Sequence, residues 1–354
     1  MSWIEPKYSK AEVNRAGDTL IDSTSSSEQT DKALEVLDNW RASHSYPMHV
    51  FKIRLKAKAL TVDLKALTVQ RLKRVPAIIK KLQRRYGGKE PTMTLSQMQD
   101  IGGCRAVVSN VRMAKDLCDF HYIKGDLKHN LVRVKDYIKD PKNDGYRSIH
   151  LIYRYVSDKG KKEYNDLLVE IQIRSKLQHL WATAIETVGF FTRQALKSNE
   201  GEQEWMDFFR LVSSAFARME GCPSIPNTPT DEKELYLEIK KKEAELNVIQ
   251  KMKGWMEAIK VFEQQVKQTP KLQYFLLELD IAGGKLNITA YREDDGEKAI
   301  IDYSKSEKRN MGNKEYDVVL VGADASTDLK KAYPNYFLDC EEFLKNLKKI
   351  VSEY

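Results

Sequence analysis

The sequence Lys135-Asp-Tyr-Ile-Lys-Asp-Pro-Lys-Asn-Asp-Gly-Tyr-Arg-Ser-Ile-His150 decides the predicted fold, together with Val169-Glu-Ile-Gln-Ile-Arg174 further along the chain. The first stretch combines lysines, a Gly-Tyr pair and a histidine. The second alternates polar and apolar residues, so Glu170 and Gln172 share one face of a strand and the isoleucines face a core. Together they offer cations for phosphates, a ring for a base and an acid for metal or proton chemistry. This combination indicates nucleotide chemistry.

The surrounding segments predict an α+β domain with a mixed β-sheet flanked by helices. Residues 31–44 have helical apolar spacing, and 49–84 are expected to be largely helical, with Pro76 as a kink or boundary. Residues 97–108 predict a short helix, a Gly-Gly bend and a buried strand. Further strands are expected near 131–138, 148–156 and 167–174, and further helices over 177–194 and 202–219.

The pattern changes after a segment with three prolines, Cys222-Pro-Ser-Ile-Pro-Asn-Thr-Pro-Thr230, which is the best linker candidate. Asp231 opens a charged helix that is expected to run to about Val266. An antiparallel meander of four strands should follow, with a C-terminal helix over one of its faces. We therefore expect three units: 1–222, a linker and long helix over 223–270, and 271–354. The four strands are expected at 274–281, 285–291, 299–303 and 316–321.

Bulk properties exclude several classes of protein. A chain of 354 residues is long enough for two domains, and no apolar run reaches the roughly 20 residues of a membrane helix. The first residues lack the apolar stretch of a signal peptide. The four cysteines are scattered without a CxxC pair, which argues against structural zinc and a disulfide framework. A cytoplasmic protein with no membrane partner is expected.

Charge is unevenly distributed along the chain. From residue 231 onward there are 21 Lys and Arg against 24 Asp and Glu, whereas the first part has 38 against 27. The resulting net charges of −3 and +11 indicate a polyanion-binding module joined to a part of opposite sign. A well-solvated, lysine-rich surface is the plainer interpretation.

Two motifs place cations and a carboxylate near phosphates. In Arg71-Leu-Lys-Arg-Val-Pro-Ala-Ile-Ile-Lys-Lys81 several cations lie near one helical face and can converge on a triphosphate, although a solvated basic helix has the same pattern. Asp100 precedes the Gly-Gly pair before a strand, and Arg105 can stack on a purine or pair with phosphate. An ordinary helix-to-strand turn with an ion pair is the alternative.

Two further motifs supply the acceptor side. Glu170 can hold magnesium or deprotonate a hydroxyl, although polar residues on the outer face of an edge strand commonly give the same alternation. Gly145 permits a turn, Tyr146 can stack on a base and His150 can donate to a phosphate, whereas a hairpin with a core tyrosine is the plainer alternative. Each of the four motifs is weak evidence for nucleotide chemistry by itself. Their occurrence together in this order is strong evidence.

In this order the four motifs resemble the pyrophosphokinase domain of the RelA/SpoT alarmone synthetases over about residues 50–190. The chain departs from the family pattern at Ala77, where the family usually has serine, and at Asn143-Asp-Gly, where it has Asn-Gly. The resemblance implies a RelA/SpoT synthetase fold and transfer of pyrophosphate from ATP to a ribose 3′-oxygen. No histidine precedes aspartate, so the His-Asp hydrolase domain of bifunctional members is not expected.

The resemblance also implies a role for each matching residue. Asp100 and Glu170 would bind Mg²⁺, and Glu170 would also activate the acceptor hydroxyl, beside Tyr146 as the stacking ring of the catalytic site. The ATP-binding residues would be Arg71, Lys73, Arg74, Lys81 and Arg105, and the acceptor-binding residues Lys135, Tyr146, His150 and Gln172.

The whole chain is similar to a narrower group, the toxic small alarmone synthetases fused to their own antitoxin, which is the CapRel type of phage-defence protein. That likeness implies a tail like a zinc-finger domain without its metal ligands (a pseudo-zinc-finger), whose Tyr333 and Tyr336 block the ATP site. A phage major capsid protein would release it, and the enzyme would modify the 3′-CCA end of tRNA. For the two tyrosines, packing of a helix end against a sheet is the plainer alternative.

Three hypotheses for function remain at this point. The first is a tRNA-modifying toxin, favoured by the basic first part of the chain. The second is a synthetase of guanosine or adenosine alarmones of the (p)ppGpp or ppApp type, which uses the same active site. The third is an inactive RNA-binding regulator, against which Asp100, Arg105, Tyr146 and Glu170 argue because all four are present.

Overall fold

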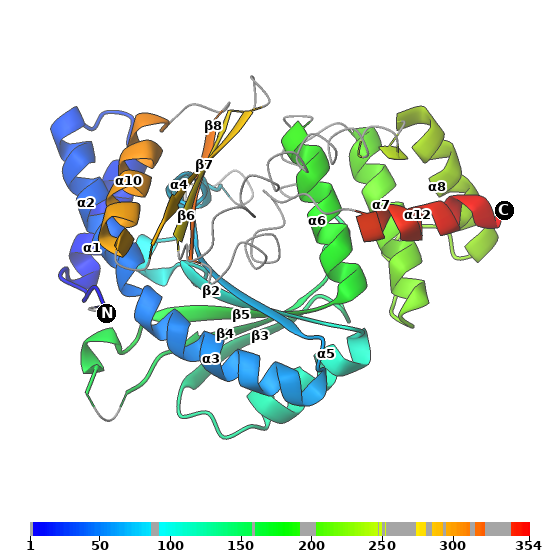
Figure 1. Cartoon of the computed structure of the whole chain (residues 1–354), viewed down its shortest axis with the longest axis horizontal. Helices are drawn as coiled ribbons and strands as arrows, with labels where there is room; N and C mark the ends of the chain where they lie inside the picture. The colour runs from blue at the N-terminus through cyan, green and yellow to red at the C-terminus, as the bar shows by residue number, and fades with distance from the viewer. Residues whose placement is uncertain are drawn as a thin grey trace.

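A computed structural model gives the structure of the chain (Figure 1). In the described part of the chain, the two larger hydrophobic cores lie beneath a five-stranded sheet and among the helices that follow that sheet, and a smaller cluster joins the C-terminal strands to a helix. The residues that the structure describes are 3–85, 92–157, 160–191, 203–246, 248–249, 252, 274–280, 285–292, 295–311, 316–322 and 341–354.

The chain begins with three helices: α1 (Lys10–Ile21), α2 (Ser27–Ser43) and α3 (Ser45–Val62). Capping boxes start α1 and α2, because the Ser9 and Ser26 side chains accept backbone N–H groups that have no partner within the helix. The structure confirms the helix expected over 31–44. α3 packs along the sheet and supplies buried apolar side chains to the first core.

The expectation that 49–84 is largely helical is wrong. After α3 the chain turns at Asp63, whose carboxylate accepts the backbone N–H groups of Lys65 and Ser109, and continues as strand β1 (Leu67–Leu72). The apolar residues of this segment fit the spacing of a helix and that of a strand. Pairing with β2 makes the segment a strand. Pro76 lies in the first turn of α4 (Val75–Leu82), where its missing N–H costs nothing.

The central sheet is mixed and has the order β1-β2-β5-β4-β3. β2 (Gly102–Val108) runs parallel to β5 (Leu168–Ser175), and the other neighbouring strands are antiparallel. β3 (Asn130–Asp136) and β4 (Ile149–Arg154) complete it, so the three strands expected over 131–174 are confirmed. The Gly-Gly pair belongs to β2 rather than to a bend. Gly102 is packed closely, since a Cβ there would lie 3.2 Å from that of His44.

Helices lie on both sides of this sheet. Figure 1 shows α3 and α5 (Val111–Cys118) along one face, whereas α4 and α6 (Lys176–Phe191) flank the opposite face. α7 (Gln203–Met219) packs on α6. Within the described residues, these two helices confirm those expected over 177–194 and 202–219. Three short helical turns lie in the connections, at Leu95–Gln97, Asp119–Ile123 and Lys162–Tyr164.

Beyond the proline-containing segment, α8 (Glu232–Leu246) begins where the charged helix was expected, and the Asp231 side chain accepts the N–H of Glu234 at its start. The expected continuation to Val266 lies outside the described residues. The final helix, α12 (Glu341–Glu353), packs against α6 and α8 and joins the second core, rather than covering the C-terminal sheet as expected.

The C-terminal sheet has three antiparallel strands in the described part of the chain, in the order β7-β6-β8. They are β6 (Tyr274–Asp280), β7 (Lys285–Tyr291) and β8 (Tyr316–Gly322). The strand expected at 299–303 is instead part of helix α10 (Gly296–Arg309), so the four-stranded meander is wrong. Burial in α10 recurs at helical spacing, at Ala299, Tyr303, Ser306 and Glu307.

None of the helices that the structure describes is both long and apolar enough to span a bilayer.

Gly145 gives the first testable prediction. Its φ of 93° is left-handed, and a Cβ there would lie 2.8 Å from Trp181 Cζ2 and 3.1 Å from Ser213 Cβ. Gly145→Ala should therefore lower the free energy of unfolding by about 2–4 kcal/mol, through backbone strain and crowding together. Gly160→Ala is the matched control, because its φ is 58° with nothing within 4 Å, and it should cost only about 1–2 kcal/mol. Urea denaturation measures both, and equal losses would contradict the crowding.

Candidate functional site

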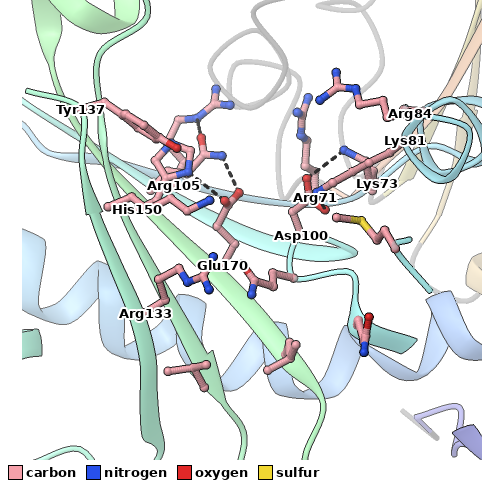
Figure 2. Close-up of a pocket in the computed structure, with 18 of the residues that line it drawn as sticks. Arg71, Lys73, Lys81, Arg84, Asp100, Arg105, Arg133, Tyr137, His150 and Glu170 are labelled. Atoms are coloured by element: carbon pink, nitrogen blue, oxygen red, sulfur yellow. Dashed lines mark hydrogen bonds and ion pairs between the residues drawn. The ribbon is translucent and has the colours of Figure 1, made fainter. Parts of the chain in front are cut away.

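A cavity of about 1130 Å³ lies over the sheet face that α3 does not cover. It exceeds the roughly 300–1,000 Å³ of most small-molecule pockets. Side chains from all five strands form its floor, and residues of α1, α4 and α6 contribute to its sides, including Lys10, Lys81 and Glu186. Figure 2 shows its charged side chains converging from the strands and from α4.

The strand register aligns the floor in rows. In one row, Arg105 of β2 lies beside Gln172 of β5, which pairs with His150 of β4, which pairs with Lys135 of β3. The next row runs from Arg71 of β1 through Gly103, Glu170 and Ile152 to Arg133 of β3. Because glycine has no side chain, the floor between Arg71 and Glu170 is open. Polar groups far apart in sequence therefore meet on one surface.

At the α4 end, one carboxylate joins two lysines. Asp100 accepts from Lys73 Nζ at 2.9 Å and from Lys81 Nζ at 2.8 Å. Burial alone would raise the pKa of Asp100, but the two ammonium groups outweigh it and hold that pKa well below its usual range. Burial lowers the pKa of Lys73, with Asp100 acting in the opposite direction. The cluster therefore holds an ionised carboxylate at neutral pH.

Arg71 and Arg105 lie between the Asp100 cluster and Glu170 at the centre of the floor. The Arg105 guanidinium donates through Nε to Gln172 Oε1 at 3.3 Å. Burial, followed by the charges of Arg174 and Arg71, depresses the pKa of Arg105. Such a crowd of cations in a partly buried site is stabilised by an incoming anion, which relieves their mutual repulsion.

Glu170 lies at the centre of the floor, between two hydrogen-bond partners. His150 Nδ1 lies 2.8 Å from Glu170 Oε1, and Gln172 Nε2 donates to Oε2 at 2.6 Å. Burial would raise the pKa of Glu170, but the hydrogen bond and charge of His150 reverse this and lower it. The pKa of His150 is raised, because Tyr146 and Glu170 outweigh its burial. Glu170 is thus an ionised, oriented acceptor of protons or metal.

Tyr146 closes the other end of the floor. Its hydroxyl lies 2.8 Å from His150 Nε2 and accepts from Arg174 Nη2 at 2.6 Å, and the Arg174 guanidinium lies 5.0 Å from the centre of its ring. Lys142 Nζ lies over both this ring and that of Tyr137, at 5.0 and 4.7 Å. Aromatic rings that bind cations also stack with nucleobases, so this end of the cavity suits a base.

The structure brings most of the expected residues together. Arg74 is an exception: it precedes α4, does not line the cavity, and its charge acts on Tyr303 of α10. Tyr333 and Tyr336 lie outside the described residues. The expected residues that line the cavity are Arg71, Lys73, Lys81, Asp100, Arg105, Lys135, Tyr146, His150, Glu170 and Gln172.

Sequence reasoning missed four residues that complete the site. Arg174 continues the alternation of Glu170 and Gln172, and that spacing was a usable signal. Arg133 precedes Lys135 by two residues on β3 and was detectable in the same way. Tyr137 and Lys142 lie within the stretch Lys135–His150, but the contact of Lys142 with the rings of Tyr137 and Tyr146 forms only in the folded chain.

Comparison with known proteins agrees with the motif order. Residues 70–190 match the model described as the region found in RelA/SpoT proteins. GTP pyrophosphokinase YjbM of Bacillus subtilis is 32% identical over 123 residues, which is 34% of this chain and 54% of that protein. GTP pyrophosphokinase YwaC of the same organism is 35% identical over 118 residues, 33% of this chain and 54% of that protein. The chain spans about half the length of these curated relatives.

Solved structures are also similar to this chain. The crystal structure of small alarmone synthetase 1 from Bacillus subtilis bound to pppGpp is 24% identical, covering 50% of this chain and 88% of that one, with a TM-score of 0.42. A GTP pyrophosphokinase family protein from Streptococcus pneumoniae is 23% identical, covering 49% and 83%, with a TM-score of 0.39. The expected resemblance to the RelA/SpoT pyrophosphokinase domain is confirmed for residues 70–190.

Tyr146 gives a testable prediction about the electrostatics of the site. Burial would raise its pKa, but the charge of Arg174, and next that of His150, brings the pKa down to about 7. One tyrosine should therefore ionise as pH rises through about 7, well before ordinary tyrosines at about 10. Ultraviolet difference absorbance of the phenolate measures this. Tyr146→Phe should remove the early step and Arg174→Gln should move it to higher pH, and an unchanged titration in Tyr146→Phe would disprove the assignment.

Proposed function

We propose that this chain is an ATP-dependent pyrophosphokinase that transfers the β,γ-pyrophosphate of ATP to a ribose 3′-hydroxyl. The observation that carries the proposal is the position of Glu170, in one cavity with phosphate-binding cations on one side and Tyr146 with His150 on the other. The names of the curated relatives, GTP pyrophosphokinases, support the same reaction.

The ATP end would be formed by β1, α4 and β2. Lys73 and Lys81 would neutralise the triphosphate, and Arg71 and Arg105 would hold the adenine between their planar guanidinium groups. Arg74 is also proposed as a phosphate ligand from the family motif, although it does not line the cavity. Phosphoryl-type transfer depends mainly on alignment and charge neutralisation. This cluster supplies both without a covalent intermediate.

A divalent metal fits the chemistry of the donors. Mg²⁺ is usually bound by one or two carboxylates together with substrate phosphates, and Asp100 and Glu170 are carboxylates of one cavity held ionised by their neighbours. These two residues would hold it. The ion would supply charge neutralisation on the transferred group, which adds to that of the lysines.

On the acceptor side Glu170 would act as the base. The 3′-oxygen forms a bond to the β-phosphorus, the bond from that phosphorus to the α,β-bridging oxygen breaks, and AMP leaves with the electron pair. The hydroxyl proton passes to a Glu170 oxygen. His150 and Gln172 hold this carboxylate in place, and Tyr146 would stack on the acceptor base beside Lys135.

The acceptor that we propose is the 3′-CCA end of tRNA, so that the product inhibits translation. The net charge of +11 on the first 230 residues favours a polynucleotide. The alternative is a synthetase of (p)ppGpp- or ppApp-type alarmones, which the names of the relatives favour. Both acceptors use the same chemistry at Glu170.

We also propose that the C-terminal unit controls the enzyme. In this proposal Tyr333 and Tyr336 block the ATP site, and a phage major capsid protein activates the enzyme by releasing them. Its support in the described residues is a buried junction. Glu307 of α10 pairs with Arg41 of α2 at 3.3 Å and accepts the Val75 N–H of α4 at 3.2 Å. Glu307 of α10 therefore caps the N-terminus of α4, where no side chain of the neighbouring sequence does so. α4 is also the helix that bears Lys81.

Glu170→Gln tests the reaction directly. Incubation with γ-labelled ATP, bulk tRNA, GDP and GTP should label an acceptor with the unaltered protein, and the variant should lose at least about 100-fold, since the amide cannot accept the proton. Glu163→Gln is the matched control, because it makes the same change at an exposed carboxylate outside the cavity. Full activity in Glu170→Gln would rule out Glu170 as the base, and no label on any acceptor with the unaltered protein would refute the proposed activity.

Glu307→Gln tests the control. The amide still accepts the Val75 N–H but loses the buried ion pair with Arg41, so the C-terminal unit should dock less tightly. Transfer without any activator should rise about fivefold or more, the lower end of typical coupling between sites. Lys308→Gln is the control on the same helix, since its ion pair with Asp31 is exposed and contributes little. Unchanged or reduced transfer by a folded Glu307→Gln protein would contradict inhibition through this junction.

A further inference from the structure

The connection between β3 and β4, residues 137–148, carries Tyr146 and contains no helix or strand. Within it, the Gly145 N–H donates to Lys142 O at 2.9 Å, and the Tyr146 N–H donates to Asp144 Oδ1 at 2.8 Å. These bonds shape a local turn, but they do not fix that turn to the rest of the molecule. The place of the Tyr146 ring over the cavity floor therefore depends on contacts between the connection and other elements.

Arg147, the next residue of the connection, makes three such bonds from a side chain that is only 4% exposed. Its Nη1 donates to Ile138 O at 3.3 Å, its Nε to Ser213 Oγ of α7 at 3.3 Å, and its Nη2 to Pro223 O at 2.6 Å. Burial lowers the pKa of Arg147, and a buried guanidinium needs acceptors that replace its lost hydration. Arg147 thus joins the connection to α7 and to the proline-containing segment, residues 222–230.

Gly145, on the other side of Tyr146, meets the same two elements. Ser213 Oγ donates to Gly145 O at 2.6 Å. A Cβ on Gly145 would lie 3.4 Å from Ile225 Cδ1, so the buried side chain of Ile225 lies close to the backbone of the connection. The residues before and after Tyr146 are therefore both held by α7 and by the proline-containing segment.

The proline-containing segment is itself fixed on α7. Ser214 Oγ accepts the Ile225 N–H at 3.0 Å and lies 2.9 Å from Thr228 Oγ1. Soon after the segment, α8 begins, and α8 packs on both α7 and α12 in the second core. The segment therefore joins the end of the cavity that holds Tyr146 to the second core, and it supports the site rather than serving as a free tether.

We infer that Arg147 is a positioning residue that acts through Tyr146, and that the proline-containing segment is part of the structure that places the acceptor base. The inference rests on the proposed function, in which the Tyr146 ring stacks on that base. Without Arg147 the ring keeps its hydroxyl bonds to His150 and Arg174 but loses a fixed backbone. The acceptor then binds less tightly, whereas the cations at the ATP end, on β1, β2 and α4, are unaffected.

Titration of Tyr146 tests the positioning without any need for catalysis. Burial would raise its pKa, and the charges of Arg174 and His150 bring it down to about 7. Arg147→Gln and Ile225→Ala should each move this ionisation about one pH unit higher, because a loosely held ring loses part of its interaction with those charges. Ultraviolet difference absorbance of the full-length protein measures the shift. Ile225→Ala changes no charge, so its shift reports the position of the ring alone.

Transfer kinetics separate positioning from a loss of folded protein. With whichever acceptor the unaltered protein labels, both variants should raise KM for the acceptor about tenfold and change KM for ATP by less than about twofold. A smaller folded fraction would lower kcat alone. Arg210→Gln is the matched control, because it makes the same substitution at an exposed bond to the same segment, from Arg210 Nη2 to Pro226 O at 3.4 Å. It should leave the titration and both KM values unchanged.

An unshifted titration in both folded variants would overturn the inference, as would a loss of kcat alone, equal rises in the two KM values, or the same effects in Arg210→Gln. If the unaltered protein labels no acceptor, the proposed function fails, and the titration still decides whether Arg147 places Tyr146. If Arg147→Gln does not fold, Ser213→Ala takes its place in both arms, because it removes the bond to Gly145 O at the same junction.

Discussion

The parallel pairing of β2 with β5 is the constraint on which the site depends. It places Arg105 beside Gln172 and the side-chain-free Gly103 beside Glu170. Buried apolar residues on the other face, such as Ile171 and Ile173, hold this register against α3 and the first core. Because side chains alternate between faces, a slip of one residue would turn the polar side chains of β5 into the core and the isoleucines into the cavity. The hydrophobic core therefore sets the geometry of the polar site.

Charge compensation explains why so many ionisable groups can share this surface. Asp100 is neutralised by Lys73 and Lys81, and the charge of Glu170 is held by His150 and Gln172. A buried charge is tolerated when partners satisfy it, and here most of the partners come from other segments of the chain, Gln172 alone lying on the same strand as Glu170. The same pairs keep these side chains in place over the cavity.

Sequence alone predicted the strands around the central motifs, and with them the shared face of Glu170 and Gln172, because alternation over a buried strand is a strong local signal. It failed at β1, whose apolar residues suit helix and strand equally and whose state is decided by pairing with β2. It failed again in α10, where Ala299 and Tyr303 also fit a strand pattern. The capping of α4 by Glu307 could not be predicted from sequence, because Glu307 and Val75 are 232 positions apart and meet only in the folded chain.

The packing of α12 has a consequence for the order in which the protein can mature. Phe343, Leu344, Leu347 and Ile350 fill the core between α6, α7 and α8, although they come from the last helix of the chain. A ribosome releases the chain from its N-terminus, so β6, α10 and β8 are synthesised before this core can close. The helices beside the cavity therefore gain their full support only after the whole C-terminal unit exists. A polypeptide without α12 lacks part of the core that supports α6, the helix that contributes Glu186 to the side of the cavity.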